Sequence, residues 1–110
     1  MTLNIERVDR IVEIQHRLEI LASDDRRILA EIQSDPAHPW VNHIGIAADL
    51  YILPRLVSIS LDKLLEMGFL TEVQLDETRK GLQLNQNGSD AQILTKVLYP
   101  EDVGFKSSTS

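Results

Sequence analysis

The first stretch of the chain carries apolar residues at the spacing of an amphipathic helix. No glycine or proline interrupts residues 3–22, and one side of the predicted helix carries Ile11, Ile14, Leu18 and Leu21. Their spacings of three, four and three residues form a seam like that of a coiled coil. Because an isolated helix of this length is unstable in water, its apolar side must be covered. We expect a second copy to cover it, so residues 1–22 are predicted to form a dimerisation helix.

Three more helices are predicted before the pattern changes. Ser23 is a suitable N-cap for a helix over residues 24–33, since the acidic residues that follow it favour the helix dipole. Prolines in "SDPAHPW" end that helix. The next two helices are expected over residues 41–50 and 54–67. Gly68 is predicted to follow the last of these at its C-terminal end.

Between residues 70 and 85 the apolar pattern changes from helical to alternating. The pairs Val73/Leu75 and Leu82/Leu84 alternate with polar residues on either side of "DETRKG". Alternation around a polar turn is typical of a β-hairpin. It predicts strands over residues 70–75 and 82–85 around a turn at residues 76–81. "NQNGSD" then predicts a turn and a helix cap before a last helix over residues 91–98, and residues 100–110 are expected to be a flexible tail.

Composition and charge narrow the class of protein. A chain of 110 residues suits one core, and its 43% hydrophobic and 25% charged residues are ordinary for a globular domain. There is no cysteine, no apolar run of membrane-spanning length and no signal-peptide pattern at the N-terminus, so we expect a cytoplasmic protein. The formal charge of -6 disfavours a nonspecific nucleic-acid coat, because such binding depends on phosphate neutralisation.

From residue 23 onward, the predicted order of three helices, a hairpin and a final helix resembles the winged helix-turn-helix family. The spacing of key residues is most similar to that of the MarR-type bacterial regulators. The two helices before the hairpin match the family's pattern of small, aliphatic, serine and glycine positions at eight places: Ala47, Leu50, Ile52, Val57, Ser58, Leu61, Leu64 and Gly68. "LQLNQNGSDAQIL" also resembles the family's exit from the second strand, with Asn85 in place of the usual threonine.

This resemblance implies a mainly α fold with a small β-hairpin wing, in which a winged helix-turn-helix domain over residues 23–99 follows the N-terminal helix. It also implies sequence-specific binding of double-stranded DNA by a small dimeric transcriptional regulator. The helix over residues 54–67 would be the recognition helix, which enters the major groove. At 100° per residue its outward side carries Arg55, Ile59, Asp62 and Glu66, with Lys63 at the flank.

The expected DNA contacts come from the recognition helix and the wing tip. Arg55 lies in the first helical turn, where it can reach a guanine edge or a phosphate, and Ile59 can touch a thymine methyl group. The outward carboxylates Asp62 and Glu66 would repel phosphates. The complete set of predicted DNA-binding residues is Arg55, Ile59, Lys63, Thr78, Arg79 and Lys80.

Two other functions remain open from the residues alone. The acidic balance and the apolar residues Leu53, Leu56 and Ile59 are compatible with a winged helix that binds a protein partner instead of DNA. "LLEMGF" also resembles the first helix and loop of a ubiquitin-associated domain. That second interpretation requires a helix over residues 73–85, which the alternating pattern opposes.

Catalytic and metal-binding patterns are weak. Asp35, His38 and His43 lie close in sequence, but their spacing matches no strong metal signature. We find no nucleophile with a base and no glycine-rich phosphate loop, so we expect neither an enzyme nor a cofactor. Trp40 is expected to fill the core beside the short strand that, in the family this chain resembles, pairs with the wing. A base-stacking role is the less favoured interpretation.

Overall fold

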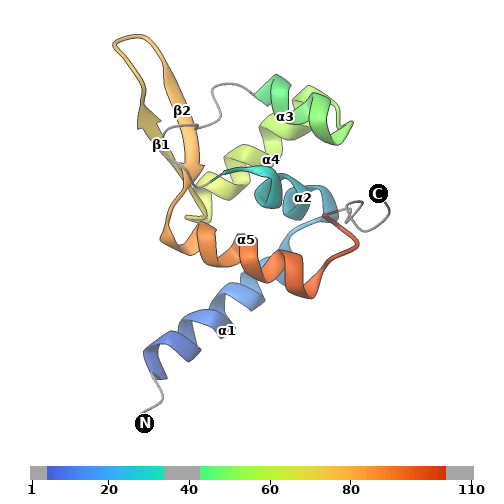
Figure 1. Cartoon of the computed structure of the whole chain (residues 1–110), viewed down its shortest axis with the longest axis vertical. Helices are drawn as coiled ribbons and strands as arrows, with labels where there is room; N and C mark the ends of the chain where they lie inside the picture. Colours follow the sequence, from blue (N-terminus) through green and yellow to red (C-terminus); the bar gives the residue numbers. More distant parts are fainter. Residues whose placement is uncertain (1–4, 34–42, 104–110) are drawn as a thin grey trace.

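The computed structural model describes residues 5–33 and 43–103 (Figure 1). From α2 onward the order of elements is the predicted one: three helices, an antiparallel hairpin and a final helix. The elements are α1 (Ile5–Ile20), α2 (Ser23–Glu31), α3 (His43–Leu50), α4 (Pro54–Glu66), β1 (Leu70–Gln74), β2 (Lys80–Leu84) and α5 (Gln86–Leu98). Trp40, Asp35 and His38 lie outside the described residues, as does any strand formed by residues 34–42.

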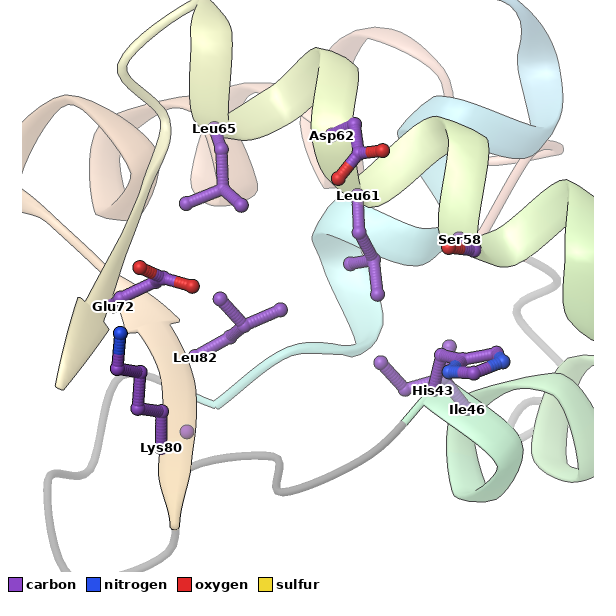
Figure 2. A pocket seen from close by; sticks show the side chains of 10 residues that line it. His43, Ile46, Ser58, Leu61, Asp62, Leu65, Glu72, Lys80 and Leu82 are labelled. Atoms are coloured by element: carbon purple, nitrogen blue, oxygen red, sulfur yellow. The ribbon is translucent and has the colours of Figure 1, made fainter. Parts of the chain in front are cut away.

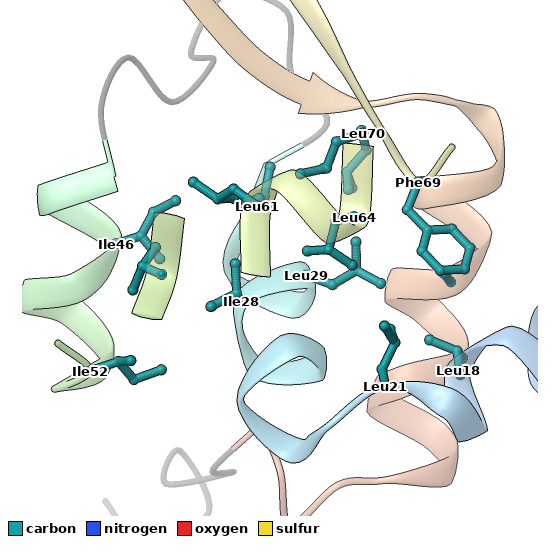
Figure 3. Close-up of a cluster of buried hydrophobic side chains, with 14 of the residues drawn as sticks. Leu18, Leu21, Ile28, Leu29, Ile46, Ile52, Leu61, Leu64, Phe69 and Leu70 are labelled. Atoms are coloured by element: carbon teal, nitrogen blue, oxygen red, sulfur yellow. The ribbon is translucent and has the colours of Figure 1, made fainter. Parts of the chain in front are cut away.

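The core lies between α2, α4 and α5 and is closed by α1 (Figure 3). Leu29, Leu64 and Phe69 are fully buried there. α1 contributes the buried Ile14 and Leu18, and Leu21 follows directly after the helix. Figure 3 shows Leu18 and Leu21 beside α5.

The burial of α1 corrects a prediction made from the apolar seam. Ile14, Leu18 and Leu21 are covered by their own chain, so they offer no surface to a partner and the predicted dimer seam is wrong at these positions. Ile11 is only half-buried and lines a groove between α1 and α5. The helix therefore packs into the same core as residues 23–99.

The start of α2 is held by the C-terminal part of the chain. Ser23 is the first helical residue, and its hydroxyl donates to the Asp102 carboxylate at 2.8 Å instead of capping the helix. Arg26 Nε donates to the same carboxylate at 2.6 Å, and its guanidinium lies 4.1 Å from the centre of the Tyr99 ring. The start of the predicted flexible tail is therefore anchored through Asp102, and residues 104–110 lie outside the described part.

The residues that follow α3 and α4 have left-handed backbone angles. Gly68 follows α4 with a φ of 84°, and Phe69 N donates to Leu64 O at 3.0 Å, which confirms the predicted glycine-terminated helix end. Tyr51 follows α3 with a φ of 57°, although a tyrosine side chain disfavours this left-handed region.

The hairpin confirms the prediction made from the alternating pattern. Leu70 pairs with Leu84 at its base, and Val73 pairs with Gly81. Gly81 therefore lies within β2 and not in the turn, which is formed by residues 75–79. Because residues 73–84 form strands and a turn, the ubiquitin-associated interpretation is wrong.

α5 begins five residues earlier than expected, so "NQNGSD" is mostly helical and not a turn. Asn85 is the N-cap: its side-chain oxygen accepts from Gly88 N at 2.8 Å, while its own backbone N–H donates to Phe69 O at 3.2 Å. A Cβ at position 88 would lie 1.7 Å from Phe69 O, so glycine is required for this close approach. The helix thus starts directly against the base of the hairpin.

None of the described helices is long and apolar enough to cross a membrane alone. Only α3 and α4 taken together meet those criteria, and they are bent by 114° relative to one another.

Candidate nucleic-acid interface

The side chains that α4 exposes and those that it buries are the ones predicted from the sequence. Val57, Leu61 and Leu64 are buried against the core. The opposite side exposes Arg55, Ile59, Asp62 and Glu66. The candidate recognition helix therefore presents a mixture of one cation, one aliphatic side chain and two carboxylates.

A groove separates this helix from the hairpin. It has a volume of about 270 Å³ and lies between α3, α4 and the two strands (Figure 2). Figure 2 shows Asp62 of α4 and Glu72 and Lys80 of the hairpin around the opening. The full lining is His43, Ile46, Ser58, Leu61, Asp62, Leu65, Glu72, Lys80, Gly81 and Leu82. The groove is therefore flanked by α4 on one side and by the hairpin on the other, and the two elements border it together.

Lys63 is engaged by a carboxylate of its own chain. Its Nζ donates to Asp25 Oδ2 at 2.7 Å, and Ser60 Oγ donates to Asp25 Oδ1. Burial raises the pKa of Asp25, but the hydrogen bonds from Lys63, Ser60 and the Ala22 backbone outweigh burial and hold this pKa below its ordinary value. The charge of Lys63 thus stabilises the contact between α2 and α4, and a phosphate would have to compete with Asp25 for it.

The wing tip is organised by Asp76. Its carboxylate accepts from the backbone N–H of Thr78 at 2.9 Å and of Arg79 at 2.8 Å, and from Arg79 Nε at 2.7 Å. The hydrogen bond from the Thr78 backbone, followed by those from Arg79, lowers the pKa of Asp76 to about 2. The predicted wing contacts Thr78, Arg79 and Lys80 are all exposed, but the charge of Arg79 is already matched.

Cations and carboxylates are nearly balanced on the surface formed by α4 and the hairpin. The cations are Arg55, Lys63, Arg79 and Lys80, and the carboxylates are Asp62, Glu66, Glu72, Asp76 and Glu77. Within the part of the chain that the structure describes, Arg55 and Lys80 have no carboxylate at ion-pair distance. This surface therefore offers a duplex few unmatched positive charges.

Two residues of this region were not found from the sequence. Asp25 was interpreted only as a helix-start residue, because nothing in the sequence around it indicates a bond to α4. Tyr51 is 90% exposed at the turn between α3 and α4. The sequence did contain a sign of this unusual turn, because tyrosine stands directly after the predicted helix, where glycine or asparagine is usual.

Comparison with solved structures identifies the fold. The crystal structure of the transcriptional regulator SlyA is similar with a TM-score of 0.62 and 14% identity, over 92% of this chain and 75% of that one. The S. aureus MepR-DNA complex is similar with a TM-score of 0.55 and 17% identity, over 94% of this chain and 84% of that one. No protein-family model and no curated protein matches the sequence. At these identities the similarity concerns the fold: the chain has the winged helix-turn-helix fold found in these two regulators.

Proposed function

We propose that the chain is a transcriptional regulator that binds specific double-stranded DNA. The observation that carries this proposal is the exposed start of α4, where Arg55 and Ile59 project from the domain beside a hairpin whose tip carries Arg79 and Lys80. A helix of this kind contacts base edges in the major groove, and a wing contacts the flanking backbone or minor groove. One protein of the same fold was solved as a DNA complex. Such a function belongs to a compartment that holds DNA, in agreement with the cytoplasmic location expected from the sequence.

We also propose that the chain acts as a homodimer, through a surface different from the seam predicted first. Ile93 and Val97 on α5 are 60% and 68% exposed, and Val8 and Val12 on α1 are exposed as well. A groove of about 140 Å³ runs between the two helices and is lined in part by Ile11, Ile93 and Leu94. An exposed apolar area on adjacent helices marks an interaction surface, and a second copy would cover both sides of it symmetrically.

A binding titration tests the DNA proposal. Duplex fragments are titrated with the native protein at about 50 mM salt, where phosphate contacts are strong. Arg55→Ala should weaken binding by about 1–3 kcal/mol and relax the preference at one base pair of each half-site, because a bidentate arginine reads guanine.

The matched control for that experiment is Lys96→Ala. This substitution removes the same charge from α5, outside the surface formed by α4 and the hairpin, so it should leave binding nearly unchanged. An equal loss in both variants would show that Arg55 acts only through net charge. Absence of any DNA binding by the native protein would refute the proposal.

A second candidate is a protein-binding winged helix. It is favoured by the carboxylates on the same surface and by the exposed apolar residues Leu53, Leu56 and Ile59. Under this alternative no duplex binds at low salt, and a protein partner protects these three positions from solvent.

A further inference from the structure

The surface of α4 and the hairpin has little capacity for phosphate binding. Two of its four cations are held by carboxylates of the same chain: Lys63 by Asp25, and Arg79 by Asp76. Phosphate contacts supply most of the affinity of a typical DNA-binding protein. If this chain binds DNA as proposed above, a larger share of its affinity must therefore come from contacts with the base edges.

The same part of the molecule exposes large apolar side chains that the fold does not need on its surface. Leu53 and Ile59 are each 59% exposed and Leu56 is 42% exposed, all within the first two turns of α4 or directly before it. Their neighbours Val57 and Leu61 already fill the core on the inward side. The exposed aliphatic residues thus form a surface at the N-terminal end of α4, the end that would enter the major groove of DNA first.

The major groove offers one kind of apolar group at its base edges, the C5 methyl of thymine. Leu56 and Ile59 are three residues apart, so they lie about 4.5 Å from one another along the helix axis. Successive base pairs are separated by about 3.4 Å. Two aliphatic side chains at this spacing can therefore each contact a methyl group on adjacent base pairs.

We propose that α4 recognises thymine methyl groups through Leu56 and Ile59, with Arg55 beside them, so that the preferred sites contain adjacent thymines. This inference rests on the proposed DNA-binding function and names the chemistry by which one site is distinguished from another. The carboxylates Asp62 and Glu66 follow on the same helix and disfavour sites that offer only phosphate contacts.

Uracil substitution provides the test. Sites are selected from a random duplex pool with the native protein, and each selected duplex is then remade with uracil at its thymine positions. Uracil lacks only the C5 methyl group, so base pairing and phosphate charge are unchanged. Binding should fall about four-fold for each contacted methyl group, in line with the transfer of one buried methyl-sized group.

Two variants show whether the stated residues carry the effect. Leu56→Ala with Ile59→Ala should bind thymine and uracil duplexes with equal and weaker affinity, while remaining folded because both side chains are exposed. Lys96→Ala should retain the full preference for thymine, and circular dichroism checks the fold of each variant.

The outcomes separate this inference from the proposed function. If selected sites bind equally well with thymine and uracil, methyl recognition is refuted while DNA binding stands. A thymine preference that survives in the Leu56→Ala, Ile59→Ala variant also refutes it, because other residues then read the methyl groups. If the native protein retains no duplex from the pool, the proposed function fails and this inference fails with it.

Discussion

Asp25 is buried where α2 begins, and its carboxylate binds two residues of α4. The bonded partners Ser60 and Lys63 are 35 and 38 residues away in sequence. The exposure of Arg55 and Ile59 could be predicted because helical periodicity is a local property. The bond to Lys63 could not, because it depends on how α2 packs against α4.

Replacing Asp25 by asparagine should lower the free energy of unfolding by about 1–3 kcal/mol, because the neutral amide removes the charge that pairs with the Lys63 ammonium and leaves one acceptor oxygen in place of two. Since the folded pKa of Asp25 is depressed, its contribution is complete above the unfolded value of about 3.9 and is lost as the pH falls through the lower folded value. Urea denaturation of both proteins should therefore show a stability difference that shrinks below about pH 4. The exposed Asp62→Asn is the control and should change stability by less than about 0.5 kcal/mol. A difference that persists unchanged at lower pH would contradict this assignment.

Tyr51 combines a left-handed backbone with an almost fully exposed ring. Tyr51→Asn should raise the free energy of unfolding by about 1 kcal/mol, because asparagine tolerates this conformation and little packing is lost. The same change at Ile59, which is exposed but helical, should instead lower it by about 0.5 kcal/mol. Thermal denaturation compares the two. A destabilised Tyr51→Asn would mean that the ring contributes more to the fold than its exposure indicates.

At the scale of elements, α4, the hairpin and α5 meet at one point. Phe69 O accepts from Asn85 N, and the Asn85 side chain accepts from Gly88 N. The alternating pattern was sufficient to predict the hairpin. A helix cap in "NQNGSD" was predicted, but the start of α5 was placed too late because glycine and asparagine are also usual in turns. Here Asn85 caps the helix and Gly88 allows a close backbone contact.

Gly88→Ala tests this junction. Alanine favours helices by about 1 kcal/mol over glycine, so helix propensity alone predicts stabilisation. The clash with Phe69 O should instead destabilise the protein by about 1–3 kcal/mol. Urea denaturation measures the change, with the exposed Gln86→Ala on the same helix as the neutral control. A stabilised Gly88→Ala would show that the hairpin base moves readily away from α5.

At the scale of the whole molecule, α1 completes the core of its own chain. An apolar seam shows that a helix side is covered but not which chain covers it, and for this reason the sequence pattern led to the wrong dimer residues. The exposed residues of α1 and α5 were not identified as a surface, because their proximity depends on the packing of two segments far apart in sequence.

Paired substitutions on the exposed side of α5 and on the buried side of α1 should have opposite results. Ile93→Asp with Val97→Asp should give a folded monomer, because both side chains are exposed on the proposed dimer surface. Ile14→Asp with Leu18→Asp should unfold the chain, because each would bury an unpaired charge in the core. Light scattering measures the mass, and circular dichroism measures the helix content. A native protein that is monomeric at high micromolar concentration would contradict the dimer.

The contact between Gly88 and the Phe69 carbonyl also limits how related sequences can diverge. Any substitution at position 88 adds a Cβ where the backbone of residue 69 already lies, so drift at this position requires a compensating change in the hairpin base. Glu77 at the exposed wing tip carries no such constraint. In an alignment of relatives, position 88 should therefore be nearly invariant, position 85 should vary only among residues able to cap a helix, and insertions should accumulate at residues 75–79.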